Sequence, residues 1–522
     1  MRHRLILLAS ALATMPASAD VRLPKIFTDN MMLQRDLPVH VWGWADAGEA
    51  VSVTLSGKTA ATKADAKGQW SLALPAIKSG ENLELLVKGN NSLTLKNVII
   101  GDIWVCGGQS NMEMVLNGCL GVEDDIKTAD LPKIRRIKIN HAKAIEPQTD
   151  APNGTAQWQV CASGTARGFT AVGFYFAREI VAKTGVPIGL MDDCWGATRI
   201  EPWTPNEGLA LVDELKPELV AQQDAQKAYL NNQMPKALTA MEAWIALTKQ
   251  HLASGVQVTP APVIPTNPAI EGWSGMYNAM IHPLVHFPIK GALWYQGEAN
   301  GGESDSYYHK MRAMIGGWRK AWGLGEFPFY FAQLANFQAA SEEPAGGDGW
   351  SKVRAAQTKS LAIPNTGMAV IIDTVPLAEK GDIHPKNKFD VGMRLARWAL
   401  NRDYGQKQLE VSGPLFKALT IDGGKACLAF DHVGAGLMVG KKEGRNPTLE
   451  DKGGKLARFA IAGEDKKWVW ADAVIVGKTV VVSSAAVPQP VAVRYAFTMN
   501  PDGCNLYNKD GLPASPFRTD AW

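Results

Sequence analysis

The alternation of apolar and polar residues changes character at Val98. From Val21 to about Asn97, short alternating runs such as VHVWGWA (39–45) and VSVTLSG (51–57) are separated by Gly, Asp and Asn. Regular alternation of this kind predicts a small antiparallel β-sandwich. From Val98 the chain reads VIIGDIWVCGG, a continuous apolar run that is typical of a strand buried on both faces of a parallel sheet. We therefore expect an N-terminal β-sandwich domain over residues 20–98 and a second domain from residue 99.

The second domain has an α/β pattern with one interruption. A helical run (169–185) that ends in glycine is followed by a strand-like run (186–196), and strand, helix and strand together predict an α/β fold. Residues 205–266 are rich in Ala, Leu, Gln, Lys and Glu and end in a Pro-rich stretch, which predicts an inserted helical hairpin and a linker. The α/β domain then consists of residues 99–204 and 267–403, and short strands beyond it predict a C-terminal β-rich domain over 404–522.

The first 19 residues have the pattern of a secretory signal peptide. Arg2 and Arg4 precede an apolar run, and a small-x-small sequence ends at Ala19. The run is shorter than the roughly 20 residues that a membrane-spanning helix needs, and no other run of that length lacks charge. We expect an exported protein, periplasmic or secreted, without a membrane span; a buried N-terminal helix is the alternative.

Composition and charge exclude several classes of protein. In 522 residues, 46% are hydrophobic and 20% charged, which argues against disordered, collagen-like and multi-span membrane proteins. The net charge is only +3, so the chain lacks the excess of positive charge that a dedicated nucleic-acid binder needs. We expect no nucleic-acid partner, and the composition does not indicate an oligomeric state.

Cysteine and histidine spacing gives no sign of a metal or cofactor. None of the six cysteines forms a C-x-x-C motif, which argues against a zinc site. In an oxidising compartment, the first disulfide to test is Cys427 with Cys504. The alternative is that these two residues are separate buried thiols. His282 and His286 stand four apart, but Pro283 lies between them and no acidic residue is near. We predict no metal site and no cofactor.

One serine stands where an α/β fold places its ligands. G-x-S-x-G, H-E-x-x-H and the P-loop are all missing, but GGQSNME (107–113) directly follows the predicted buried strand. Ser110 would lie at the carboxyl end of that strand, and the two glycines permit a sharp turn. If a helix begins there, its first amides could stabilise an oxyanion. The alternative is that Ser110 only caps the helix.

A serine nucleophile requires a base, and Asp382-Ile383-His384-Pro385 offers a histidine with a carboxylate. The segment follows the strand-like run GMAVIIDT (367–374), so it should lie at the same sheet edge as Ser110. Residues two apart in an extended segment point the same way, so Asp382 could orient His384. Asp373 is a competing orienting acid, and an unpaired surface histidine is the alternative for His384.

Four segments in order, GQSNM, CWGATRIEPW, WYQGEAN and DIHP, resemble the signature blocks of the SGNH hydrolase superfamily, specifically its sialate O-acetylesterase-like carbohydrate esterases. The resemblance covers nearly the whole mature chain, including DNMMLQRDLPVHVWGWA near its start and NLYNKDGLPASPFRTDAW at its end. It implies an SGNH-type, flavodoxin-like, three-layer α/β/α hydrolase domain that is flanked by β-rich domains.

The resemblance also implies roles for individual residues. Ser110 is expected to be the nucleophile, with its own amide, the Gly196 amide and the Gln296 side chain forming the oxyanion hole. His384 is expected to be the base and Asp382 its partner, although the superfamily often has D-x-x-H and this chain has Gly381 at that earlier position. The residues expected to contact the substrate are Gln109, Asn111, Glu113, Arg199, Glu201 and Glu298, with Trp203 nearby; salt bridges and packing are their alternative roles.

The expected function is removal of O-acetyl groups from a carbohydrate through an acetyl-serine intermediate. The acetylated carbohydrate could be sialic acid or a plant-wall polysaccharide such as xylan or xyloglucan. Two other functions remain open. One is a non-catalytic carbohydrate-binding protein, and the other is a lipase or peptidase with the same triad.

Overall fold

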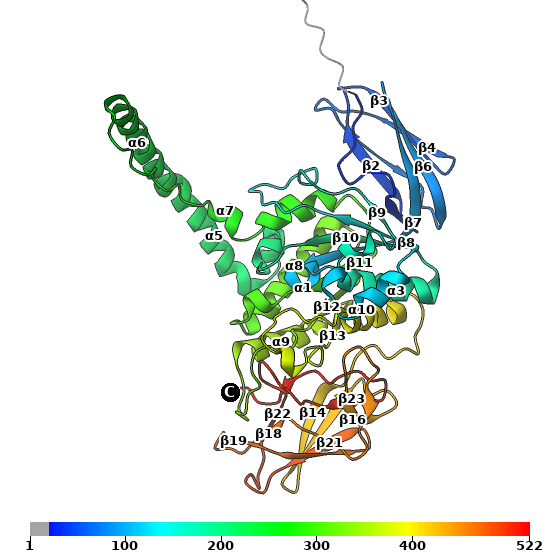
Figure 1. Ribbon diagram of the computed structural model, residues 1–522, viewed down its shortest axis with the longest axis vertical. Helices are drawn as coiled ribbons and strands as arrows, with labels where there is room; N and C mark the ends of the chain where they lie inside the picture. The colour runs from blue at the N-terminus through cyan, green and yellow to red at the C-terminus, as the bar shows by residue number, and fades with distance from the viewer. Residues whose placement is uncertain (1–19) are drawn as a thin grey trace, which may run out of the picture.

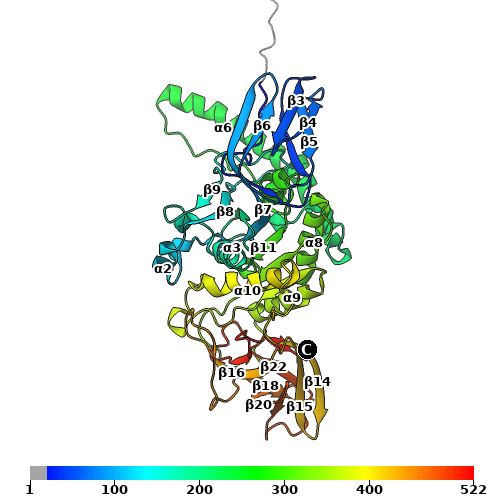
Figure 2. The same ribbon diagram turned by 90° about the vertical axis from the view of Figure 1, so that its right-hand side faces the viewer.

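The computed structural model describes residues 20–522, and the predicted signal peptide lies outside the described residues. The molecule is elongated, with antiparallel strands at each end and an α/β body between them (Figures 1 and 2). The expectation of an α/β fold with additional β-rich regions is confirmed. The finer assignment to an SGNH-type three-layer domain, and the domain limits, remain predictions.

The N-terminal strands form one sheet and one two-stranded ribbon. In the sheet, β3, β4 and β6 pair antiparallel and join the first half of β7, which also pairs with β1; in the ribbon, β2 pairs with β5. The bounds are β1 Met32–Gln34, β2 Val39–Trp44, β3 Ala50–Leu55, β4 Lys58–Lys63, β5 Gln69–Leu74, β6 Gly80–Lys88 and β7 Ser92–Gly108.

Strand β7 connects this sheet to the α/β body without a break. Its first residues alternate in exposure, whereas every residue from Val98 to Gly108 is buried. The change of sequence pattern at Val98 therefore marks where one strand passes from a half-exposed sheet into a sheet covered on both faces. The expected boundary after residue 98 falls inside β7.

The central sheet has the strand order β13-β12-β11-β7-β10-β8-β9, and all its strands are parallel except β9. Because β11 and β10 flank β7, the chain segments that leave their carboxyl ends meet around the end of β7. The bounds are β8 Leu131–Lys138, β9 Gln159–Cys161, β10 Ile188–Cys194, β11 Gly291–Tyr295, β12 Phe329–Ala332 and β13 Thr366–Ala369.

Helices cover both faces of this sheet. On one face, α3 (Ala171–Thr184) and α10 (Lys388–Arg402) pack over a cluster that includes Trp104 of β7. On the other, α8 (Asp305–Trp322) and α9 (Gly349–Lys359) pack over a cluster that includes Val105. The shorter helices are α1 Ser110–Glu113, α2 Val122–Lys127, α4 Asn206–Leu209 and α7 Pro268–Glu271.

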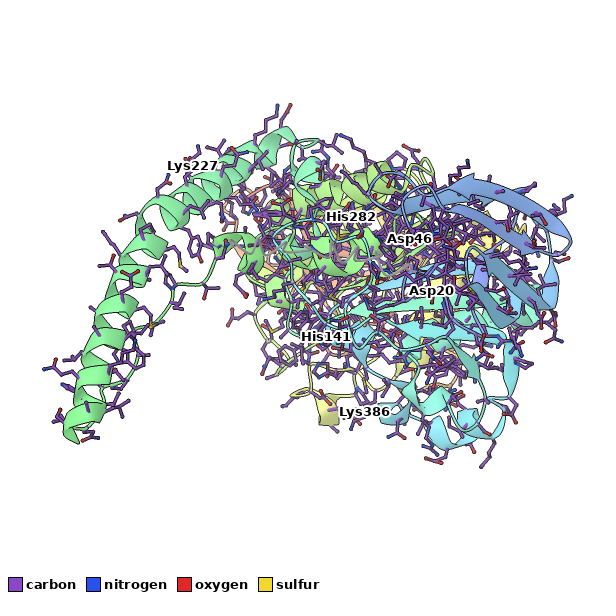
Figure 3. The ribbon with its side chains drawn as sticks, turned by 90° about the horizontal axis from the view of Figure 1, so that it is seen from above. Asp20, Asp46, His141, Lys227, His282 and Lys386 are labelled. Atoms are coloured by element: carbon purple, nitrogen blue, oxygen red, sulfur yellow. The ribbon has the colours of Figure 1, made fainter. Side chains whose placement is uncertain are left out.

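The predicted helical hairpin is wrong. Helices α5 (Lys216–Ala228) and α6 (Met234–Ser254) are joined through a π-helical turn, Tyr229–Gln233, into one bent arm that projects from the body (Figures 1 and 3). Pro235 directly follows the π-helical turn, and a proline next to a π-bulge bends a helix without ending it, so the arm continues instead of reversing. The Pro-rich segment returns along the arm, and Trp244 donates a hydrogen bond to the Thr259 carbonyl.

The C-terminal strands form three antiparallel sheets, with the orders β14-β15-β21-β20, β19-β18-β22-β24 and β17-β16-β23. Their bounds are β14 Leu415–Asp422, β15 Lys425–Asp431, β16 Leu437–Lys441, β17 Leu449–Glu450, β18 Phe459–Ala462, β19 Trp468–Trp470, β20 Asp472–Val476, β21 Thr479–Ser483, β22 Ala492–Tyr495, β23 Leu506–Asn508 and β24 Phe517–Arg518.

All six cysteines are free thiols, so the candidate disulfide between Cys427 and Cys504 is not formed. The two residues belong to different parts of the C-terminal region, since Cys427 lies in β15 and Cys504 precedes β23. Within residues 20–522, no helix is long and apolar enough to span a membrane, and no group of three or more His, Cys, Asp or Glu side chains could hold a metal ion.

Candidate active site

Ser110 begins α1 directly after β7, at the carboxyl end of the central strand. Gly108 turns the chain with a φ of 137°, and a Cβ there would lie 2.2 Å from the Tyr295 carbonyl oxygen. Only glycine fits so close to the neighbouring strand. As the first residue of a helix, Ser110 has a backbone N–H without an intrahelical acceptor.

The structure brings Ser110 and His384 together. The Ser110 Oγ lies 2.8 Å from the His384 Nε2, across 274 positions of sequence. His384 Nδ1 lies 3.5 Å from Asp382 Oδ1, and the same carboxylate oxygen accepts the His384 backbone N–H at 2.8 Å. The three side chains form a chain of contacts from carboxylate to imidazole to hydroxyl. The His384 side chain is 39% exposed, so this chain of contacts is open to solvent.

The competing acid, Asp373, is engaged elsewhere. Its carboxylate accepts two hydrogen bonds from the Arg394 guanidinium, at 2.6 and 2.8 Å, and a third from the Tyr507 hydroxyl at 3.1 Å. Both Asp373 and Arg394 are buried. This bidentate ion pair fixes α10 to the segment after β13, and the Tyr507 hydrogen bond links that segment to β23. Asp382 is the carboxylate that contacts His384.

The surroundings of His384 lower its pKa. Burial is the largest cause and the positive charge of Lys388 the next, while the charge and hydrogen bond of Asp382 act in the opposite direction. A lowered pKa keeps the imidazole neutral near pH 7, and a neutral imidazole is the form that can accept the serine proton.

Asn111 ties the Ser110 and His384 segments together. Its amide nitrogen donates to the Ile383 carbonyl at 3.0 Å and to Glu298 Oε1 at 2.5 Å, and its oxygen accepts from Lys388 Nζ at 2.5 Å. Asn111 was expected to contact substrate, but it is fully buried. Its contacts instead position the residues around it. The residue after Ser110 thereby holds the residue before His384.

Lys388 and Glu298 form a buried charged pair on either side of the Asn111 amide. Burial lowers the pKa of Lys388 to about 8, and burial raises the pKa of Glu298. Glu298 Oε2 is buried without a hydrogen-bond partner among the described residues. A carboxylate and an ammonium group in such surroundings are costly unless they are paired, so the network around Asn111 depends on both.

Gly196 lies beside Ser110, but its amide is occupied. A Cβ on Gly196 would be 3.3 Å from the Ser110 Cβ, which is the approach expected of an oxyanion donor. The Gly196 N–H donates to Glu113 Oε2 at 2.8 Å. Glu113 Oε1 lies 2.8 Å from His141 Nε2 and 3.3 Å from Lys138 Nζ. Glu113 therefore places a carboxylate oxygen where an acyl oxygen would have to accept the same N–H.

Gln296, the other expected oxyanion donor, is fully buried and hydrogen-bonded within the protein. Its amide nitrogen lies 2.8 Å from Asn300 Oδ1, 3.1 Å from Gln109 Oε1 and 3.2 Å from the Thr198 carbonyl. Its oxygen accepts from the Tyr307 hydroxyl at 2.8 Å. Since an amide has two hydrogens, this side chain can reach an oxyanion only if the network opens. Gln109, expected to contact substrate, is buried in the same network.

The remaining residues expected to contact substrate form an ion-pair network. Arg199 is half exposed and pairs with Glu201 and Glu303, and Lys310 donates to Glu201 at 2.8 Å. Burial alone would raise the pKa of Glu201, but Arg199 and Lys310 outweigh it and lower that pKa to about 2. Trp203 is fully buried. Only Arg199 of this group offers substantial exposed surface to a ligand.

Sequence reasoning missed three basic side chains near Ser110. His141 stacks on Trp195 with ring centroids 4.5 Å apart, and with Lys138 it holds Glu113. Lys388 follows the DIHP segment by three positions and begins α10. A lysine at the start of a strongly amphipathic helix is an ordinary surface pattern, so its burial had no signal in the sequence.

Comparison with known proteins finds similarity along nearly the whole chain. A family model described as "Carbohydrate esterase, sialic acid-specific acetylesterase" matches residues 265–401. A carbohydrate acetylesterase from Xanthomonas citri is 37% identical, with a TM-score of 0.79 over 96% of this chain and 100% of that one. Sialate O-acetylesterases of Rattus norvegicus and Mus musculus are 28% and 27% identical, each over 98% of this chain and 97% of theirs.

Proposed function

Because the chain belongs to the sialate O-acetylesterase-like family of carbohydrate esterases, we propose that it removes O-acetyl groups from carbohydrates by serine catalysis. The observation that carries the mechanism is the 2.8 Å approach of Ser110 Oγ to His384 Nε2. A serine hydroxyl hydrogen-bonded to a neutral imidazole, itself next to a carboxylate, is the arrangement that generates an alkoxide-like nucleophile.

In the proposed first step, Ser110 Oγ attacks the acetyl carbonyl carbon while His384 Nε2 takes the serine proton. Asp382 stabilises the imidazolium that forms. The tetrahedral intermediate collapses when His384 gives its proton to the sugar oxygen, which leaves as a hydroxyl and leaves an acetyl group on Ser110. In the second step, His384 takes a proton from water as the water oxygen attacks the acetyl-serine carbonyl. His384 then returns that proton to Ser110 Oγ as the acetyl–oxygen bond breaks, which releases acetic acid and restores the serine hydroxyl.

The negative oxygen of each intermediate needs donors beside Ser110. The Ser110 and Gly196 backbone amides are the donors we propose, and removal of one such donor typically costs about 3 kcal/mol of transition-state stabilisation. Gly196 becomes available once the Glu113 carboxylate moves away from its N–H. Gln296 holds Gln109 and the Thr198 carbonyl in place, which positions the turns that bear these amides.

We further propose that the protein is exported and acts on an acetylated sialic acid or on an acetylated plant-wall polysaccharide, xylan or xyloglucan. Export rests on the sequence pattern of residues 1–19. The solvent-open triad suits an acetyl group that projects from a larger sugar, because the His384 and Asp382 side chains are 39% and 41% exposed.

The test is acetate release from acetylated sialic acid, acetylated xylan and acetylated xyloglucan by purified protein, with S110A as the matched control. Release by the native protein and its loss in S110A support the proposal, and the preferred substrate identifies the sugar. Faster cleavage of long acyl esters than of 4-nitrophenyl acetate favours a lipase. No release by folded protein contradicts the proposal and favours a carbohydrate-binding protein.

A further inference from the structure

A cavity lies on the N-terminal β2–β5 ribbon, apart from the residues around Ser110. Its volume is about 330 Å³, within the range of small-molecule sites. The alternation of β2 directs His40, Trp42 and Trp44 to one face of the ribbon. On β5, Ser71 pairs with Trp42 and Gln69 pairs with Trp44, so their side chains share that face.

The opposite wall comes from the α/β body. His286 and Thr149 line the cavity, and the His286 ring lies edge-on to the Trp42 ring with centroids 5.7 Å apart. Burial lowers the pKa of His286, and the neighbouring His282 and His40 act in the same direction. The imidazole is therefore neutral at pH 7. The cavity is a cleft between two parts of the fold that are far apart in sequence.

The polar groups of this cleft include an unsatisfied buried donor. The indole N–H of Trp42 is buried and has no hydrogen-bond partner among the described residues. A buried donor without a partner costs about 1–3 kcal/mol. The exposed Gln69, Ser71 and Thr149 side chains add further donors and acceptors at the rim.

The charge and aromatic content of the lining indicate the class of ligand. Among the described residues that line the cavity, Asp65 is the one carboxylate and there is no lysine or arginine. Phosphate or carboxylate ligands would lack a cationic partner among these lining residues. Trp44 is partly exposed, and the Arg22 guanidinium lies 4.4 Å from its ring centroid. A rigid aromatic surface next to neutral hydroxyl and amide groups suits the apolar face and hydroxyl edge of a sugar ring.

We propose that this cleft binds a segment of neutral glycan, independently of the active site. The inference rests on the proposed function in one respect, namely that the protein encounters polysaccharide. A second glycan contact raises the local concentration of acetyl groups near Ser110 without any new contact to the reacting atoms. The cleft would thus favour polymeric substrates over single acetylated sugars.

The test measures binding of deacetylated xyloglucan and xylan to full-length mature protein by isothermal titration calorimetry. S110A serves as the protein for titration, so that esterase activity cannot intervene. The variants are W44A and, where loss of Trp44 disturbs folding, Q69A, which removes only an exposed side chain. The matched control is W470A, because Trp470 is also partly exposed beneath an arginine, Arg458, but lies in the C-terminal region.

We expect at least a tenfold weaker Kd in W44A and Q69A and an unchanged Kd in W470A. When the same substitutions are made in protein that retains Ser110, the rate of 4-nitrophenyl acetate hydrolysis should be unchanged. The proposal is overturned if folded protein binds neither glycan, or if W44A and Q69A bind as S110A does. Failure of the esterase proposal would instead appear as absent acetate release, whatever the glycan affinity.

Discussion

The Glu113 carboxylate accepts the backbone N–H of Gly196 at 2.8 Å, next to the side chain of Ser110. A carboxylate at this point resembles an oxyanion, because it is negatively charged and accepts a hydrogen bond from the Gly196 N–H. It must leave before an acyl oxygen can accept the same N–H, and its two basic neighbours, His141 and Lys138, offer an alternative attachment. The backbone N–H that we propose as an oxyanion donor is thus already hydrogen-bonded within the protein.

This relationship predicts that E113A increases kcat/KM for a small neutral ester. Hydrogen bonds to charged groups contribute about 1.5–3 kcal/mol, so release of the Gly196 amide should raise kcat/KM for 4-nitrophenyl acetate about tenfold. E113Q, whose amide oxygen can still accept the Gly196 N–H, is the matched control and should change it less. A large decrease of kcat/KM in E113A would contradict this prediction and would show that the reaction requires the Glu113 side chain.

Substitution of the two candidate orienting acids, Asp382 and Asp373, should have different effects, one on kcat and the other on stability. D382N should lower kcat about 100-fold, less than the ~10⁴-fold effect of a buried triad aspartate, because Asp382 is 41% exposed. D373N removes the partner of the buried Arg394 and should destabilise the fold by about 3–5 kcal/mol while the folded fraction keeps its kcat. Thermal unfolding and kcat per folded molecule separate the two. A low kcat in stable D373N would reverse the assignment.

Removal of the buried lysine should shift the pH profile. Burial and Lys388 both lower the pKa of His384, and the base works only when deprotonated, so activity rises with pH through that pKa. K388M removes the positive charge, so the His384 pKa rises and the ascending limb of kcat/KM moves to higher pH. The ascending limb of kcat/KM lies at pH values below the Lys388 pKa of about 8. In that pH range the lysine is still charged in the native protein.

The matched control is K386M, because Lys386 lies in the same segment with a side chain 48% exposed to screening solvent. Its profile should match that of the native enzyme. Equal shifts in K386M and K388M, or a shift of the K388M limb to lower pH, would contradict the role of the buried charge.

The sequence predicted that Ser110 and His384 lie at the same sheet edge because the signal of each segment is local. A continuous apolar strand that ends in two glycines and a serine places that serine at a sheet edge, and the DIHP segment follows another strand of the same sheet. The bent arm was mistaken for a hairpin because composition indicates helix but not whether two helical runs reverse or continue, and here the π-helical turn Tyr229–Gln233 joins them end to end.

Hydrogen-bond partners far apart in sequence were beyond prediction. The family resemblance implied Gln296 and Gly196 as donors, but the acceptors they meet, such as Gln109 and Glu113, are set by the folded turns. Likewise, nothing local distinguishes Asp373 from Asp382 until Arg394 is seen to take up the Asp373 carboxylate.

The central claim is that acetyl transfer proceeds through Ser110. The most direct measurement is rapid-quench mass spectrometry with 4-nitrophenyl acetate on native protein, S110A and H384A, followed by peptide mapping. An acetyl group on Ser110 of the native protein, absent from S110A and formed much more slowly in H384A, is the predicted result. Acetate release with no acetylated Ser110, or with S110A as active as the native protein, would contradict the account.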